Sequence, residues 1–160
     1  MDPKFLATTI NKFLHLSAAG IVVGGLVYLR FILIPSLRGV PEAERGTLLQ
    51  AAYKKTLRWM SYSLLVLFLT GMDNIMRARK TLGVASEDLR GTYWAVFWTK
   101  MVLFILAFIL VHLLMIGAPP FRRIQAAYRW WIGVLVVVSF IIIYLSGYLT
   151  LSRLSLIPAQ

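Results

Sequence analysis

The chain has 160 residues, of which 59% are hydrophobic and only 14% are charged, and its mean hydropathy is +0.77. A soluble domain carries about 25% charged residues, so this composition excludes an ordinary soluble domain and is typical of a membrane protein. The net charge of +11 comes from 17 basic and 6 acidic residues. The basic residues fall between and at the ends of apolar segments, which predicts contact with anionic lipid headgroups rather than with nucleic acid.

The absence of cysteine narrows the possible chemistry. It excludes disulfides, thiolate metal sites, iron–sulfur clusters and covalent c-type haem attachment. The chain has no Ser-His-Asp set, no HExxH zinc motif and no P-loop, so we do not expect a hydrolase. The apolar segments contain few polar residues, which argues against a channel.

Four apolar segments predict four transmembrane helices. They cover residues of about 13–34, 59–76, 94–118 and 130–151, and each is near the length that a bilayer core requires. Tryptophan and tyrosine stand at several ends, as membrane interfaces favour. The first segment is too long for a cleaved signal peptide. We expect a single all-α domain over residues 1–160, an integral membrane bundle of four transmembrane helices with short loops.

Residues 41–58 predict an additional interfacial helix that runs into the second span. Pro41 and Glu44 suit a first helical turn. Apolar side chains then recur at helical spacing and basic ones share the opposite face; these are Leu48, Leu49, Ala52, Tyr53 and Leu57 against Lys54, Lys55 and Arg58. Such a pattern is typical of a helix that lies in the headgroup region.

An even number of spans predicts that both termini and the loop 77–93 lie on one side of the membrane. Residues 35–58 and 119–129 then lie on the other side. Eight basic residues belong to the side with the termini and nine to the opposite side. The positive-inside rule therefore favours, by a narrow margin, non-cytoplasmic termini in a bacterial inner membrane.

Polar side chains within the predicted spans mark a candidate site, because a polar group in hydrocarbon is costly unless it is paired, solvated or ligated. Three spans place informative groups at one depth, and these are His15, Met72, Asp73, Met76 and Lys100. In one interpretation Lys100 pairs with Asp73 or reaches the interface, and His15 hydrogen-bonds a neighbour. In the other, these residues form a ligand or cofactor site between facing helices.

The second histidine, His112, lies near the opposite end of the third span. It is roughly 16 residues deeper than His15, or roughly 24 Å along the membrane normal. A haem bound by both histidines of one chain is therefore not expected. A haem ligated by His15 needs a sixth ligand from Lys100, Met72 or Met76, or an open position. His112 is then a separate metal site, a dimer contact or a histidine satisfied within the bundle.

Glycines in the first span have two interpretations. Gly20 and Gly24 are four residues apart, and Gly25 stands beside them. Small residues at this spacing let helix backbones approach closely. They also make room for a flat macrocycle, which makes Gly24 a candidate cofactor-binding position.

Several short motifs resemble the CopD-like copper-resistance membrane domain, along essentially the whole chain. They are Leu14-His15-Leu16, Ala18-Ala19, Gly24-Gly25 and Pro35 in the first span, Thr70-Gly71 in the second and Trp98-Thr99-Lys100 in the third. The resemblance implies copper handling. Cu(I) prefers Cys and Met ligands, so Met72 and Met76, completed by His15 and Asp73, are the candidate copper ligands.

The chain is also similar to the HemJ-type protoporphyrinogen oxidases, which share this architecture. The similarity lies in His15, in Gly25-Leu26-Val27-Tyr28-Leu29-Arg30 and in Lys100 followed by His112. It implies a haem b site with His15, Lys100 and Arg30 as cofactor-binding residues. The chain lacks that family's proline before Arg30 and has no carboxylate in the fourth span, where the family has an Asn-Glu-x-Pro motif. These departures argue against porphyrinogen oxidation but not against haem binding.

Three functions follow as hypotheses. The first is a haem b-binding membrane protein in electron transfer or porphyrin handling, which would be an oxidoreductase if it is an enzyme. The second is copper transport or resistance. The third is a non-catalytic subunit of a larger respiratory or photosynthetic membrane complex, which fits the minimal loops and the interfacial aromatic residues. A homodimer or a larger membrane complex is compatible with each of them.

Overall fold

The computed structural model describes residues 2–83, 85–115 and 127–154. Every regular element in these ranges is helical, which confirms the predicted all-α class. The helices are α1 (Pro3–Val27), α2 (Ile34–Ser36), α3 (Glu42–Leu82), α4 (Glu87–Met115) and α6 (Tyr128–Leu154). A π-helical turn, η1 (Tyr28–Leu33), joins α1 to α2, and a 3-10 turn, η2 (Leu37–Gly39), follows α2.

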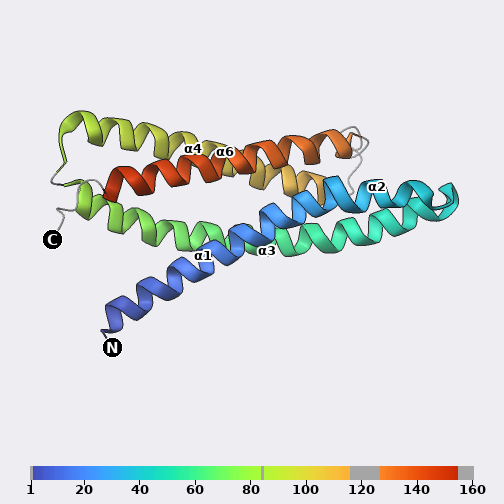
Figure 1. Ribbon diagram of the computed structural model, residues 1–160, viewed down its shortest axis with the longest axis horizontal. Coiled ribbons are helices and arrows are strands. Elements are labelled where there is room, and N and C mark those ends of the chain that lie inside the picture. Colours follow the sequence, from blue (N-terminus) through green and yellow to red (C-terminus); the bar gives the residue numbers. More distant parts are fainter. Residues whose placement is uncertain (1, 84, 116–126, 155–160) are drawn as a thin grey trace.

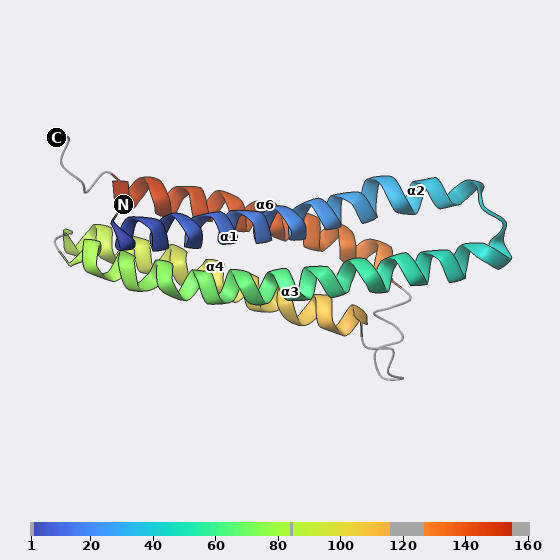
Figure 2. The same ribbon diagram turned by 90° about the horizontal axis from the view of Figure 1, so that it is seen from below.

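The long helices lie side by side along one axis (Figure 1). The start of α1, the connection from α3 to α4 and the end of α6 lie at one end of the bundle in both views (Figure 1 and Figure 2). The hairpin between α2 and α3 projects at the opposite end. α1 packs mainly against α3, and α4 packs mainly against α6. The two ends of the described chain therefore share one end of the bundle.

Three helical segments are long and apolar enough to cross a membrane, namely Pro3–Gly39, Glu87–Leu114 and Tyr128–Ser152. The predicted span over 59–76 lies within α3, which is not among them. Its apolar stretch includes the polar residues Asp73 and Asn74, and Arg58 and Arg77 bound it on either side. The chain is thus an all-helical protein with three candidate membrane spans.

The exterior of the bundle is apolar. Large apolar side chains are exposed on every long helix, among them Phe13, Trp59, Trp98 and Phe140. A water-soluble monomer rarely exposes apolar surface of this extent, whereas helices in contact with lipid tails do. The exposed side chains therefore agree with the apolar composition of the three candidate spans.

α3 is a single continuous helix of 41 residues. At about 1.5 Å per residue it is about 62 Å long, roughly twice the thickness of a bilayer hydrocarbon core. The helical conformation predicted over 41–58 is present from Glu42 onward, as the first part of α3. A separate interfacial helix is not confirmed, because no break divides this part from the rest of α3 (Figure 2).

The hairpin before α3 is closed by one side chain. The Arg45 guanidinium donates hydrogen bonds to the carbonyl oxygens of Val40 at 2.9 Å and of Arg38 at 3.0 Å. These carbonyls follow the end of a helix, where the helix itself supplies no donors. Arg45 therefore fixes the direction in which α3 leaves the hairpin.

The first span continues beyond its predicted end at Pro35. Proline has no N–H and its ring crowds the carbonyl of the residue four positions earlier, here Phe31. The helix accommodates this by widening into the π-turn η1 and resuming as α2. Leu29 and Ile34 remain buried on either side of the proline, so packing against the bundle carries the helix past it.

Two packed clusters of buried side chains hold the bundle together. The main cluster combines α1, η1, α2, α3, α4 and α6 and contains Val22, Leu26, Leu29, Ile34, Leu57, Met60, Leu64, Ala107, Val111, Leu114, Ile132, Leu135 and Val136. The second cluster lies toward the α3–α4 connection and contains Ala78, Leu82, Ala85, Tyr93, Phe97 and Leu149. The main cluster thus joins all four long helices, whereas the second cluster joins α3, α4 and α6.

The glycines of α1 do not all face a neighbouring helix. A Cβ atom added at Gly25 would lie 3.3 Å from the Met60 sulfur, so this glycine lets α3 approach closely. An added Cβ at Gly20 or Gly24 would meet nothing within 4 Å. The expected close packing at Gly20 and Gly24 is therefore absent among the described residues, because that side of α1 faces outward.

The packing predicts that truncation of two leucines of α3 to alanine lowers the stability of the protein by different amounts. Leu57 has no exposed area and belongs to the main cluster, whereas Leu65 is 51% exposed. We expect Leu57→Ala to lower the free energy of unfolding by about 2–5 kcal/mol, since it leaves a cavity in a close-packed interior. Leu65→Ala is expected to cost less than about 1 kcal/mol. Denaturant unfolding in detergent micelles, followed by circular dichroism, measures both; equal losses would contradict the packing described.

Candidate functional site

A cavity of about 750 Å³ lies inside the bundle, with walls from α1, α3, α4 and α6. Its lining includes residues of both packed clusters, such as Leu26 and Leu64 of the main cluster and Phe97 of the second. The lining is mainly apolar. The polar residues in it are Lys12, His15, Asn74, Lys100, Ser139, Ser146 and Thr150. Binding sites for small molecules in helix bundles have this size and this character.

His15 is anchored to α3 by a hydrogen bond. Its Nδ1 atom lies 2.7 Å from the Thr70 Oγ1 atom. Thr70 is buried, and its hydroxyl also lies 2.7 Å from the carbonyl oxygen of Val66 on the preceding turn. Thr70 thus connects the imidazole on α1 to the backbone of α3.

The two short contacts of Thr70 favour one position for the proton of the His15 imidazole. A hydroxyl has one proton, and the Val66 carbonyl accepts but cannot donate. Since Thr70 donates to that carbonyl, it accepts from His15, and the imidazole proton is on Nδ1. The Nε2 atom of the neutral ring therefore keeps its lone pair. A histidine that binds a metal usually donates its other N–H to a partner in this way.

Lys100 enters the same cavity from α4 and is largely buried. Within the described parts of the chain, no group hydrogen-bonds its ammonium and no carboxylate pairs with it. A cation removed from water without a counterion is costly. The arrangement is therefore suited to a ligand that brings a negative charge or an electron-pair donor to Lys100.

Asp73 and Met76 do not belong to the cavity. Asp73 forms a salt bridge with Arg77, one turn further along α3, in which the Arg77 Nε atom donates to the Asp73 Oδ2 atom at 2.8 Å. Arg77 also donates a hydrogen bond to the Thr8 hydroxyl. The expected Lys100–Asp73 ion pair is therefore wrong, because Arg77 is the partner of Asp73. Met76 is 63% exposed and points outward, so only Met72 of the predicted methionine pair lines the cavity.

Three other candidate residues lie elsewhere. Gly24 faces outward and is not in the cavity lining. Arg30 lines a separate groove at the other end of the bundle. His112 lies outside the cavity, and its Nδ1 atom is 2.8 Å from the Phe108 carbonyl while its ring packs on the Phe108 ring at a centroid distance of 4.2 Å. This geometry fits the interpretation of His112 as a histidine satisfied by its own helix.

A site built from protein ligands alone is not evident. The described residues contain no group of three or more His, Asp or Glu side chains that could hold a metal ion. The side chains in the cavity lining that offer nitrogen or sulfur donors to a metal include His15, Lys100 and Met72, with Met101 also in the lining.

Sequence reasoning missed the polar residues that support His15. Thr70 entered only as part of a motif, and Asn11 was not considered. The Asn11 amide donates to the Thr70 carbonyl and to the Asn74 side chain, both at 3.4 Å. The sequence contains one indication of this contact. A histidine in an apolar span needs a polar partner at its own depth on a neighbouring helix, and Thr70 is one of the few polar residues at that depth.

The cavity reaches the exterior between α1 and α6. Leu16 of α1 and Leu151 of α6 both line it, yet they remain 71% and 69% exposed. α1 diverges from α6 toward its N-terminal end (Figure 1). A lipid-soluble molecule therefore has a path into the cavity from the apolar surroundings of the bundle.

Comparison with protein-family models, with curated proteins and with solved structures finds no match for this chain. The resemblance to CopD-like and HemJ-type proteins accordingly depends on the short motifs quoted above. The residues of those motifs that line the cavity are His15, Leu16, Ala19, Leu26, Gly71 and Lys100, and Thr70 hydrogen-bonds His15.

The role of Thr70 can be measured directly. In Thr70→Val the Nδ1–H of His15 loses its acceptor, so we expect a mixture of the two neutral tautomers and a loss of stability of about 1 kcal/mol. The tautomer is read from ¹⁵N chemical shifts of labelled histidine in detergent micelles, where the wild type is expected to show the Nδ1–H form. Thr99→Val is the matched control, since the exposed Thr99 hydroxyl bonds only its own helix at Ala95. An unchanged His15 spectrum in Thr70→Val would contradict the assignment.

Proposed function

We propose that this chain is a haem b-binding integral membrane protein that acts in electron transfer or porphyrin handling. The observation that carries the proposal is the anchored His15, whose free Nε2 shares an apolar cavity with the unpaired ammonium of Lys100. Imidazole is a common axial ligand of haem iron. The mainly apolar lining supplies the dry surroundings that a haem site needs.

The residues present fit the chemistry of haem b. The macrocycle is a large apolar group, and a cavity of about 750 Å³ is in the range of small-molecule sites. Its two carboxylates need cations, and Lys100 and Lys12 are the basic residues in the lining. Met72, or Lys100 in its neutral amine form, would be the second protein ligand of the iron beside His15. Bound haem b supplies one-electron redox chemistry, or ligand binding where an axial position is open.

Haem binding is expected to depend on His15 and not on His112. Purified wild-type chain titrated with haemin should shift and sharpen the Soret band relative to haemin in detergent alone, and His15→Ala should weaken haem binding at least about tenfold, since an iron ligand is lost. His112→Ala is the matched control, because this histidine lies outside the cavity. Absorption spectra of the oxidised and reduced samples measure the effect. A band of undiminished intensity in His15→Ala would rule out this site.

A copper protein of the CopD-like type is the second candidate. Met72 in the cavity wall beside His15 favours it, because a thioether and an imidazole are suitable ligands for Cu(I). The outward position of Met76 and the pairing of Asp73 with Arg77 leave this site with few ligands. The haem proposal has the stronger support for that reason.

A non-catalytic subunit of a respiratory or photosynthetic membrane complex is the third candidate. The outward face of α1 at Gly20 and Gly24 favours it, since a helix of another chain could approach closely there. The same face also suits a homodimer.

We infer that the chain crosses the membrane four times, with the apolar part of α3 over residues 59–76 as the fourth span. Met60 and Leu64 in this part of α3 pack in the main cluster with residues of α1, α4 and α6, which supports this inference. Residues 42–58 would then extend toward or into the headgroup layer. By the positive-inside rule the termini would be non-cytoplasmic in a bacterial inner membrane.

Single cysteines test this topology, since the chain has none of its own. With four spans, Lys4→Cys and Ser86→Cys should react with a membrane-impermeant maleimide from one face, and Gly39→Cys from the opposite face. The three positions are exposed, and an added Cβ at Gly39 meets nothing within 4 Å. Labelling of intact cells and of inverted vesicles gives the side. If Ser86→Cys and Gly39→Cys react from the same face, α3 does not cross the membrane and the inference of four spans is wrong.

A further inference from the structure

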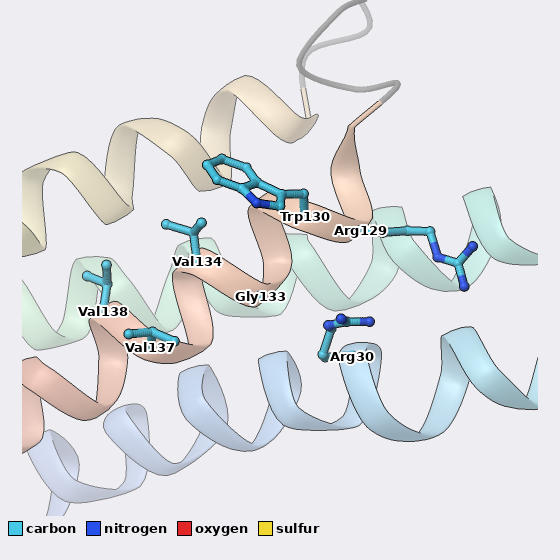
Figure 3. Close-up of a pocket in the computed structure, with 7 residues that line it drawn as sticks. All are labelled: Arg30, Arg129, Trp130, Gly133, Val134, Val137 and Val138. Carbon is cyan, nitrogen blue, oxygen red and sulfur yellow. The ribbon is translucent and has the colours of Figure 1, made fainter.

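A second hollow lies at the other end of the bundle, between η1 and the first turns of α6. It is a groove of about 430 Å³ that opens to the exterior (Figure 3). Two guanidinium groups, of Arg30 and Arg129, stand at it, and its apolar lining consists of Trp130, Val134, Val137 and Val138. The groove does not share residues with the His15 cavity, so it needs an explanation of its own.

The local fold directs Arg30 into this groove. Arg30 belongs to the π-turn η1, the widened part of the first span before Pro35. Opposite it on α6 stands Gly133, where an added Cβ would lie 3.6 Å from the Arg30 Nε atom. Figure 3 shows Arg30 reaching toward the α6 backbone at Gly133, with Arg129 at the start of α6. At this distance an added Cβ would be in ordinary van der Waals contact with Arg30, so the Arg30 side chain lies directly beside the α6 backbone at Gly133.

The two arginines lack counterions. In the described ranges the salt bridge is Asp73–Arg77, and neither Arg30 nor Arg129 has a hydrogen bond or an ion pair. Two neighbouring guanidiniums at one groove repel each other, and they bind phosphate well because each offers several N–H donors in a fixed plane. The electrostatics of the groove therefore call for an anion.

The surroundings of the arginines specify the rest of the ligand. Val134, Val137 and Val138 continue along α6 away from the charges, at the depth of the candidate span Tyr128–Ser152. Trp130 is exposed beside them, as expected for a residue at a membrane interface. A ligand that fits has an anionic head at the arginines and an apolar chain along the valines. An anionic phospholipid has both.

We propose that this groove is a binding site for an anionic phospholipid. The lipid phosphate lies between the guanidiniums of Arg30 and Arg129, and one acyl chain follows the valines of α6. The single negative charge of the lipid phosphate reduces the repulsion between the two guanidiniums, and the bound lipid ties η1 to the start of α6. The site is independent of the proposed haem function, because its residues lie outside the His15 cavity.

Native mass spectrometry of the detergent-purified chain tests the proposal. With phosphatidylglycerol and phosphatidylcholine of equal chain length added in turn, we expect the wild type to retain phosphatidylglycerol on the order of tenfold more strongly. Glycerol phosphate and inorganic phosphate, which lack acyl chains, should not displace it at equal concentration. Equal retention of the two lipids, or displacement by phosphate alone, would overturn the proposal.

Variants locate the binding to this groove. Arg30→Gln with Arg129→Gln should reduce the retention of phosphatidylglycerol to that of phosphatidylcholine. Lys54→Gln with Arg58→Gln removes the same charge from exposed positions near the same end of the bundle and should leave the preference unchanged. Gly133→Leu keeps both arginines but fills the groove, and it should also lose the preference. The proposal would be overturned if the Arg30→Gln/Arg129→Gln variant kept the preference for phosphatidylglycerol. It would also be overturned if the Lys54→Gln/Arg58→Gln variant lost the preference equally, since general charge and not the groove would then select the lipid.

Discussion

The hydrogen bond from His15 to Thr70 is the interaction on which the interpretation of this bundle depends. In an apolar interior each polar group must find a partner on a neighbouring helix, because water does not supply one. Thr70 meets this need by donating to the Val66 carbonyl and accepting from the imidazole. The bond joins α1 to α3 and orients the ring, and it leaves one ring nitrogen free.

The way in which the helices pack also produces the two hollows of this fold. The main cluster joins all four long helices, the second cluster joins α3, α4 and α6, and α1 diverges from α6 between its middle and its start. Side chains fill the two clusters but not the space between them. The cavity with His15 and Lys100 forms there, while the groove with Arg30 and Arg129 forms where the π-turn meets Gly133. Each hollow holds cations that have no counterion among the described residues, so each is suited to an anionic ligand with an apolar body.

The apolar segments predicted the helices well, because helix formation in an apolar chain follows from local composition and from the need to satisfy backbone polar groups. The continuation past Pro35 and the single helix over 42–82 were not predicted. Both depend on burial against neighbouring helices, as the buried Leu29 and Leu57 show. Span depth alone predicted that His15 and Lys100 lie at one level, whereas the cavity that they share and the exclusion of Asp73 and Met76 from it depend on the rotation of the helices.

The sequence by itself determined the all-helical class, the apolar exterior and the approximate depth of each polar group, since these depend on composition and on the rise per residue. The tertiary structure decided which side of each helix faces inward. It turned Met76 and Gly24 outward, paired Asp73 with Arg77 and placed Arg30 in a separate groove. The physical reason is that helix rotation is set by the packing of side chains from all four long helices at once, and a hydropathy pattern that is apolar on every side does not specify it.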